Sequence, residues 1–306
     1  MRSLIDTIYP AKTYFPIWQP PHISDEYETE NCRGSVECKI KYKDLIDMYN
    51  QLNLNTLSGT LYVHQPENYK YSILLPAGMN GCEITAILGL YYFVKYMLES
   101  NEAGFKWIRE NCQVQIMPCI SPDSFDACRY NNVNGVNINR NFDYNGSWFA
   151  CPSNKGTWNY KGIQPLSESE TSMLYDWLNA NHGADLYIDC HTDVTRKGCT
   201  PLERTFEAIV SNDELKNKVL NVQGILYQIY CRELLNPTKP FAVIPEPTSY
   251  PKTFVCQNHF NIPNIMIEQH AADKGHGGNG KVCSDADLRN YVTLLRAYII
   301  ACVNKD

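Results

Sequence analysis

The sequence has no basic stripe and no long apolar run. Its 33 acidic and 27 basic side chains are well mixed and give a formal charge of -6, so it has no surface suited to neutralising nucleic acid phosphates. No segment approaches the roughly 20 apolar residues that cross a bilayer. The N-terminus carries Asp6 where a signal peptide needs an apolar stretch. We therefore expect neither nucleic acid nor a membrane as a partner.

Paired-cysteine motifs are also missing. The chain has 13 cysteines, an odd number, and no two of them have the CxxC spacing of a zinc ribbon or a thioredoxin-like site. Cys112, Cys119 and Cys190 lie in or beside apolar, strand-like runs, where cysteine usually behaves as a small core residue. This usage favours a reducing, cytoplasmic compartment, although a secreted protein with a few disulfides stays open.

Hydrophobic residues make up 44% of the 306 residues and charged residues make up 20%. This composition is close to ordinary globular usage and supplies enough apolar side chains for one large core. Residues 1–41 are rich in proline, tyrosine and polar residues, and Pro16, Pro20 and Pro21 interrupt any helix. We expect an irregular N-terminal arm over 1–41, packed on a main domain that spans 42–306.

Within the main domain, strand-like and helical patterns alternate. Helices are predicted over 42–52, 84–98, 214–231 and 285–303, and strands over 71–75, 112–117, 185–190, 206–210 and 264–267. Ser167 and Glu170 have capping-box spacing before a further helix, and the segment 131–162 has no periodicity, as in a functional loop. The alternation predicts an α/β fold, with a mostly parallel or mixed twisted sheet and helices on both faces.

Polar side chains follow several of these strands. Asn80 and Glu83 come after the first predicted strand, His191 follows the strand that ends at Cys190, and Glu268 follows 264–267. In open α/β sheets, ligands bind outside the carboxyl ends of the strands. A carboxylate and an imidazole there could bind a catalytic metal, and a second carboxylate could take a proton from metal-bound water.

Two arginines follow the strand 112–117. Arg129 and Arg140, the latter preceded by Asn139, would suit an anionic substrate group and a developing oxyanion. Each element also has a plain structural explanation when it is taken alone: Glu83 as a helix N-terminal acid, His191 as a hydrogen-bonded strand-end residue, and the residues around Arg140 as a turn. Their joint order along the chain is harder to explain in that way.

This ordered set resembles the metallocarboxypeptidase family typified by carboxypeptidase A. That family has a Gly-x-His-x-x-Glu metal motif after a strand, an Asn-Pro-Asp-Gly-like turn, an arginine, an Asn-Arg pair, a distant histidine ligand and a late catalytic glutamate. The matching residues, spread over about 42–302, are Gly78–Glu83, Ser121–Ser124, Arg129, Asn139 with Arg140, His191 and Glu268.

The resemblance implies a role for each of these residues. Glu83 and His191 would be zinc ligands, Glu268 the general base and Arg129 the oxyanion stabiliser, as in the family. Asn139 and Arg140 would clamp the substrate carboxylate, and the planar, always charged guanidinium suits that task. The implied cofactor is one zinc ion, and the implied partner is a peptide or peptide-like substrate with a free carboxylate.

The sequence departs from the family at one ligand. Asn80 stands where the first histidine ligand is expected, and a neutral amide oxygen is a poorer zinc donor than an imidazole nitrogen. We expect a weakened site in which Asn80 or water completes the zinc coordination. Tyr250 is the nearest candidate for the tyrosine that some family members use near the substrate, but its surroundings do not match well enough for an assignment.

The leading hypothesis is a metal-dependent hydrolase that removes a C-terminal residue from a peptide or peptide-like substrate. One alternative is a catalytically weakened or inactive module of the same fold that binds a carboxylate-bearing ligand through Arg129, Asn139 and Arg140. Retention of Glu268 argues against it, because mere carboxylate binding does not need a base. A second alternative is an amidase or deacylase on this scaffold, since the sequence does not specify the leaving group.

Overall fold

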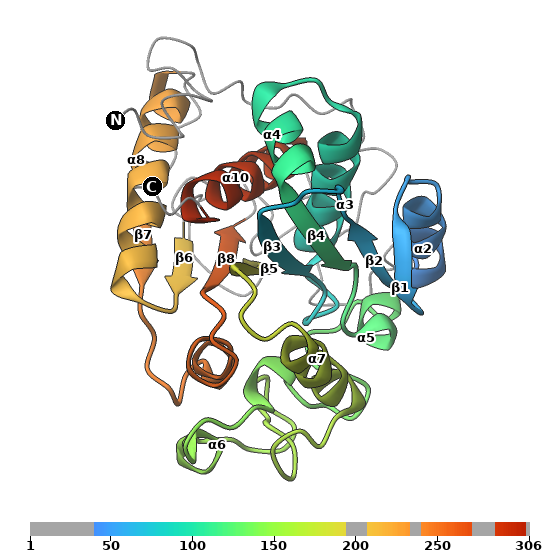
Figure 1. Cartoon of the computed structure of the whole chain (residues 1–306). Coiled ribbons are helices and arrows are strands. Elements are labelled where there is room, and N and C mark those ends of the chain that lie inside the picture. Colours follow the sequence, from blue (N-terminus) through green and yellow to red (C-terminus); the bar gives the residue numbers. More distant parts are fainter. Residues whose placement is uncertain (1–39, 194–206, 233–239, 271–284, 304–306) are drawn as a thin grey trace.

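The computed structural model describes residues 40–193, 207–232, 240–270 and 285–303 (Figure 1). The predicted N-terminal arm lies outside the described residues, except for its last two positions. Within the described ranges, none of the helices is long and apolar enough to cross a membrane.

One eight-stranded sheet forms the centre of the protein. Its strand order is β1-β2-β4-β3-β5-β8-β6-β7. Neighbours from β4 through β3 and β5 to β8 run parallel, as do β6 and β7, whereas β1 with β2, β2 with β4, and β6 with β8 are antiparallel. The prediction of a mixed α/β sheet is therefore confirmed. The strands are β1 Asn55–Ser58, β2 Leu61–His64, β3 Tyr71–Pro76, β4 Cys112–Met117, β5 Leu186–Asp193, β6 Glu207–Val210, β7 Phe241–Val243 and β8 Asn264–His270.

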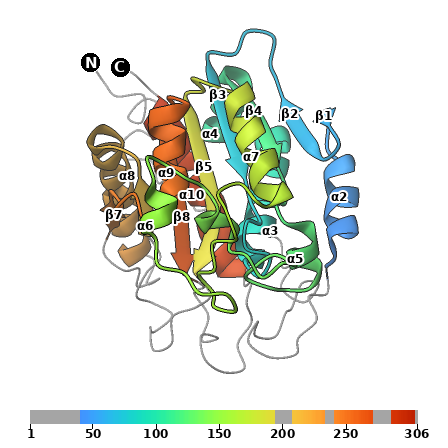
Figure 2. The ribbon, with the colours of Figure 1, turned by 90° about the horizontal axis from the view of Figure 1, so that it is seen from below.

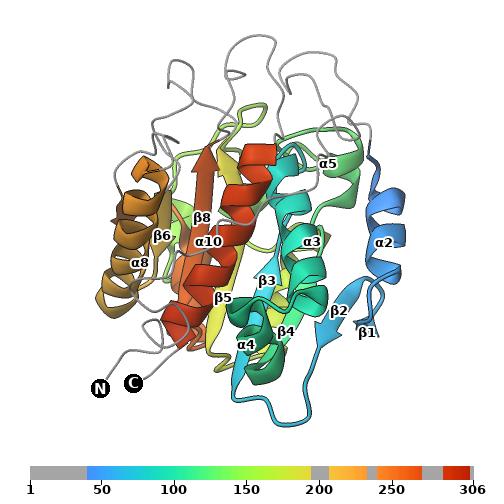
Figure 3. The same cartoon turned by 90° about the horizontal axis from the view of Figure 1, so that it is seen from above.

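Helices cover both faces of this sheet. One face carries α3 Ile84–Glu99, α4 Ala103–Asn111, α8 Asp213–Arg232 and α10 Asp285–Val303 (Figure 3). The other face carries α6 Ser147–Ala150, α7 Ser169–Ala180 and α9 Pro251–Phe254 (Figure 2). Beside β1 and β2 lie α2 Tyr42–Asn50 and α5 Pro122–Asp126 (Figure 1). The single turns η1 Ile138–Arg140 and η2 Val255–His259 are the remaining helical elements of the described residues.

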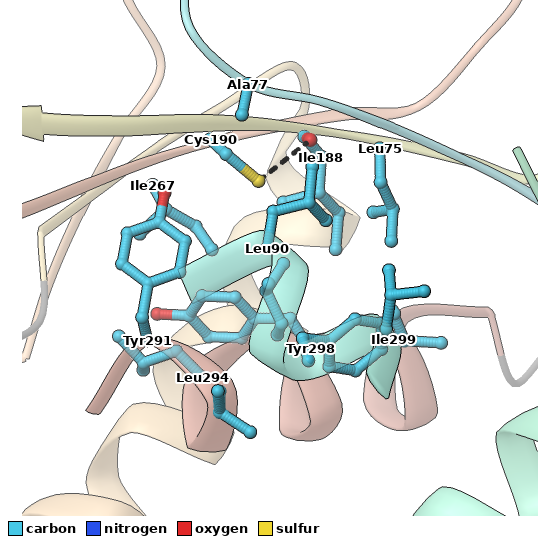
Figure 4. Close-up of a cluster of buried hydrophobic side chains, with 14 of the residues drawn as sticks. Leu75, Ala77, Leu90, Ile188, Cys190, Ile267, Tyr291, Leu294, Tyr298 and Ile299 are labelled. Atoms are coloured by element: carbon cyan, nitrogen blue, oxygen red, sulfur yellow. Dashed lines mark hydrogen bonds between the residues drawn. The ribbon is translucent and has the colours of Figure 1, made fainter. Parts of the chain in front are cut away.

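The central strands are buried on both faces, which explains their continuous apolar runs. Along β3, Ile73 and Leu75 belong to the core beneath α3 and α10, whereas Leu74 belongs to the smaller core beneath α7. Side chains alternate between the two cores because successive residues of a strand point to opposite faces. In the larger core, Tyr291 and Tyr298 of α10 face the underside of the sheet (Figure 4).

The cysteines behave as expected of small core residues. Eight of them are free thiols in the described part of the chain, and Cys112, Cys119 and Cys190 are buried. Burial raises the pKa of the Cys190 thiol to about 12, which keeps it protonated and unreactive at neutral pH.

The structure corrects several local predictions. Strand β5 continues to Asp193 and β8 to His270, so His191 and Glu268 lie within strands and not after them. The pattern missed the short elements β1, β2, β7 and α4. The capping box was wrong: α7 has Glu168 as its N-cap, and the Ser167 hydroxyl donates to the Glu168 carboxylate at 2.7 Å.

Gly89 tests how closely α3 packs on α10. A Cβ at this position would lie 2.7 Å from Cγ of Tyr291. We expect Gly89→Ala to lower the free energy of unfolding by about 1–3 kcal/mol, because the crowded ring must move. Gly224→Ala, in the interior of α8 with open space around the new Cβ, should raise it by up to about 1 kcal/mol through helix propensity. Urea unfolding of both variants measures these changes. If both substitutions raised the free energy of unfolding equally, Gly89 would not lie against the ring of Tyr291.

Candidate functional site

The candidate site lies where the strand order reverses. β3 has β4 on one side and β5 on the other, and the chain passes from β3 to β4 before it reaches β5. Loops that leave neighbouring strands in opposite directions open a crevice at such a point, where ligands bind. A bridge between Ala77 and Cys190 carries the pairing of β3 and β5 to this end of the sheet.

The loop after β3 is held tightly against α5. A Cβ on Gly81 would lie 2.1 Å from the backbone carbon of Ser124, so only glycine fits there. The amide of Cys82 donates to the Arg129 carbonyl at 3.1 Å. The loop therefore delivers Glu83 to the N-terminus of α3, where a negative charge is favourable.

Glu83 and His191 meet directly. The carboxylate of Glu83 does not cap α3; its Oε2 lies 2.8 Å from Nδ1 of His191 and accepts the Thr192 amide at 3.2 Å. Burial alone would lower the pKa of His191, but the charge and hydrogen bond of Glu83, with Glu268 contributing, raise it to about 9. The imidazole is thus positively charged at neutral pH in this arrangement.

A second carboxylate lies behind His191. Oδ2 of Asp189, on β5, is 2.9 Å from Nε2 of the same ring and in contact with the ammonium of Lys252 on α9. All of these side chains are buried. Burial lowers the pKa of Lys252 to about 7, against the opposing effect of nearby anionic groups that include Glu268. Each ring nitrogen of His191 therefore lies within hydrogen-bond distance of a carboxylate.

Asn80 lies in the same loop as Glu83 and is also buried. Its amide nitrogen donates to the Tyr130 carbonyl at 2.9 Å, which orients the side chain. Its oxygen Oδ1 is buried and has no hydrogen-bond partner among the described residues. A buried carbonyl oxygen without a partner is costly, so it marks a place for a ligand that accepts its lone pair.

Glu268 and two tyrosines face the same site. Glu268 is the strand-register partner of His191 across β5 and β8. Burial raises the pKa of Tyr250, Glu268 raises it further, and the charges of Arg140 and His191 oppose them. Burial likewise raises the pKa of Tyr130 well above its usual range, with Glu83 adding to this effect. These charged and aromatic groups therefore lie near enough to one another to interact electrostatically.

Arg140 forms the other half of the site, on η1. Its guanidinium carbon is 4.9 Å from the ring centroid of Tyr250 and 5.8 Å from that of Trp158. The side chain is buried, and its one hydrogen bond among the described residues goes to the Asn139 carbonyl at 3.3 Å. Oδ1 of Asn139 is buried without a partner there. An aromatic frame thus holds a cation that has no carboxylate partner in the part of the chain described.

Arg129 differs from the other predicted site residues in the exposure of its side chain. Its backbone carbonyl supports the loop after β3, as described above. Its side chain is exposed. The proposed role of Arg129 in oxyanion stabilisation stays a prediction.

The donor atoms of this site differ from a usual metal-binding group. Among the described residues, no three His, Cys, Asp or Glu side chains are grouped to hold one. A site here needs the amide oxygen of Asn80 beside Glu83 and His191, and the buried, partnerless Oδ1 fits that use. An ion would replace the proton between Nδ1 and Oε2, because both ligands bind metals in deprotonated form. One imidazole, one carboxylate and one amide should hold zinc more weakly than a set with two imidazoles.

Sequence reasoning missed three residues of this arrangement. Asp189 carries a signal that was available, a charged residue inside the apolar strand β5. Lys252 and Trp158 carry none, because their contacts depend on how separate loops fold over the sheet. Tyr250, which the sequence left unassigned, lies over Arg140.

The sequence is similar to one known protein family. The family model described as zinc carboxypeptidase matches residues 49–197. The resemblance to zinc carboxypeptidases is confirmed. The match includes Asn80, Glu83, Arg140 and His191 and ends before Glu268. No curated protein matches the sequence.

Several solved structures share the fold. Carboxypeptidase A from Helicoverpa armigera matches with a TM-score of 0.63 at 14% identity, over 87% of this chain and 74% of that chain. Bovine thrombin-activatable fibrinolysis inhibitor in complex with tick carboxypeptidase inhibitor gives 0.59 at 15%, over 85% and 92%. The murein-tripeptide amidase MpaA from Escherichia coli O157 gives 0.50 at 15%, over 80% and 88%. At these identities the likeness shows the fold, which the zinc carboxypeptidases share with an amidase.

Asn80→His tests the ligand set. If Oδ1 of Asn80 faces the ion, an imidazole there should tighten zinc binding roughly tenfold or more, because nitrogen is the better donor for zinc. Asn80→Ala, which supplies no donor, should bind zinc more weakly than the parent. Competition with a chromophoric chelator measures all three affinities. Equal affinities would mean that Asn80 does not face Glu83 and His191.

Proposed function

We propose that this chain is a metal-dependent hydrolase that removes a C-terminal residue from a peptide or peptide-like substrate. One observation carries the proposal: the buried guanidinium of Arg140 has no carboxylate partner in the described structure, and it shares its surroundings with the Glu83–His191 pair. A buried cation left unpaired is costly. The arrangement therefore calls for an anionic ligand next to a metal-binding pair.

The substrate carboxylate would bind at Arg140. The guanidinium can donate to both carboxylate oxygens at once, and the rings of Tyr250 and Trp158 limit its movement. The side-chain amide of Asn139, whose Oδ1 lacks a partner among the described residues, lies beside it in η1. Recognition of a chain end at this point makes the enzyme an exopeptidase, since an internal segment has no such carboxylate.

Hydrolysis requires a base next to the attacking water. A zinc ion held by Asn80, Glu83 and His191 would lower the pKa of its bound water to about 7. Glu268, the register partner of His191, accepts the proton of the attacking water and passes it to the leaving amine. Water thereby adds across the amide bond, and the products are a shortened chain with a new carboxylate and one free amino acid.

A second candidate function follows from the charges of the site. Glu83 and Asp189 are two buried carboxylates, and both lie against His191, while Asp189 also contacts Lys252. These contacts can hold the groups together without a metal ion. The same site could then bind a carboxylate-bearing ligand at Arg140 without cleaving it. Hydrolysis of a peptide substrate would distinguish the hydrolase from this binding module.

Glu268→Gln is the direct test of turnover. We expect it to keep zinc binding and to lower hydrolysis by roughly a hundredfold or more, because it removes the base and leaves the ligands. Glu207→Gln is the matched control: Glu207 is the register partner of Glu268 on β6 and has no role in the proposed chemistry. Equal activity of parent and Glu268→Gln would remove Glu268 from the mechanism, and an inactive parent that binds peptide would favour the binding module.

Substrate termini test the role of Arg140. Peptides with a free C-terminus should be cleaved at least tenfold faster than the same peptides with an amidated one, because the amide leaves the guanidinium unpaired. Arg140→Met should remove this preference by slowing cleavage of the free peptide alone. Initial rates on matched peptide pairs measure both effects. If free and amidated peptides behave alike in the parent, the exopeptidase proposal fails and an amidase becomes the better hypothesis.

A further inference from the structure

Lys252 is a buried charge that the proposed chemistry does not use. Its side chain is fully buried, its ammonium contacts Oδ2 of Asp189, and it lies 5.5 Å from the ring centroid of Tyr187. Taking an ammonium out of water costs several kcal/mol unless an anion compensates it. A methionine would fill the same space without that cost, so packing alone does not explain a lysine here.

We propose that Lys252 is a positioning residue, which acts through Asp189 to hold the His191 ring with Nδ1 turned to Glu83. The inference rests on the proposed function in one respect, since Nδ1 is the atom that would bind the metal. The chain of contacts runs from the Lys252 ammonium to Asp189 Oδ2, from Asp189 to Nε2 of His191 at 2.9 Å, and from Nδ1 to Glu83 at 2.8 Å.

The Lys252 contact fixes the carboxylate of Asp189 behind the His191 ring. Oδ2 of Asp189 contacts both the ammonium of Lys252 and Nε2 of His191, so the oxygen that accepts from the ring is the one that Lys252 holds. The second oxygen, Oδ1, is buried without a partner among the described residues. A hydrogen-bonded carboxylate behind a metal-binding histidine sets the orientation of the ring. Without Lys252, the carboxylate can turn about its Cβ–Cγ bond and lose its alignment with Nε2.

Lys252 also links the two halves of the site. It is two residues from Tyr250, which is the N-cap of α9 and lies over Arg140. The contact with Asp189 therefore ties the segment that frames the anion site to the strand that carries His191. One buried ion pair fixes the carboxylate-binding side relative to the metal-binding side.

The first test uses the metal-free protein. In the parent, the His191 ring N–H protons should give hydrogen-bonded NMR resonances at both nitrogens. Lys252→Met should shift or broaden the Nε2 resonance and leave the Nδ1 resonance, which Glu83 holds. Lys161→Met is the control, because the Lys161 ammonium donates to the carbonyls of Trp148 and Cys151 and contacts no carboxylate in the described structure. An unchanged Nε2 resonance in Lys252→Met overturns the proposal, whether or not the protein binds zinc.

The second test is zinc affinity, measured by chelator competition. Lys252→Met should weaken binding roughly ten- to a hundredfold, the usual effect of losing a group that orients a ligand, and Lys161→Met should not change it. If the parent binds zinc and Lys252→Met binds it equally well, the proposal is wrong and the proposed function stands. If the parent binds no zinc, the proposed metal-dependent function fails, and the NMR comparison alone decides the role of Lys252.

A double substitution tests the proposal if Lys252→Met fails to fold. If Lys252→Met is unfolded because Asp189 loses its contact with the ammonium, Lys252→Met with Asp189→Asn should restore folding, since the buried negative charge is gone. Restored folding supports a role through Asp189. A double variant that is also unfolded shows that Lys252 acts by packing, and the positioning role is then wrong.

Discussion

The contact between Glu83 and His191 joins the two strand ends on either side of the point where the sheet order reverses. Glu83 enters α3 directly after β3, and His191 is near the end of β5. Both side chains are buried, so neither charge is tolerated without the other. This contact consequently fixes the loop after β3 and the start of α3 relative to the end of β5. The rest of the site is arranged around Glu83 and His191.

Charge balance explains why further charged side chains surround the contact between Glu83 and His191. His191 is positively charged between two carboxylates, and the second of these, Asp189, is compensated from behind by Lys252. A divalent ion would displace the proton at Nδ1 and change the net charge of the site. Glu268, across the neighbouring strand, is the carboxylate available to offset that change. The residue that we propose as the base would then also balance the charge of the ion.

The Arg140 half of the site depends on a long irregular loop. Residues 131–162 place Arg140 on a single turn and Trp158 beside its guanidinium. Side-chain amides replace regular secondary structure there: those of Asn132 and Asn134 donate to the buried carboxylate of Glu168 at 2.8 and 2.7 Å. Because the loop is anchored to the start of α7 in this way, it can hold a buried charge without a strand or a long helix.

The sequence alone determined the fold class and the residue types at the strand ends, because the apolar periodicity and the order of Glu83, Arg140 and His191 require no knowledge of contacts. It placed His191 and Glu268 just after strands, since a strand that continues into polar residues looks like a strand that has ended. Only the tertiary structure decided which groups pair. The contact of Lys252 with Asp189 and the place of Tyr250 over Arg140 arise when separate segments fold over one sheet edge, and burial there turns ordinary side chains into a compensated set of charges.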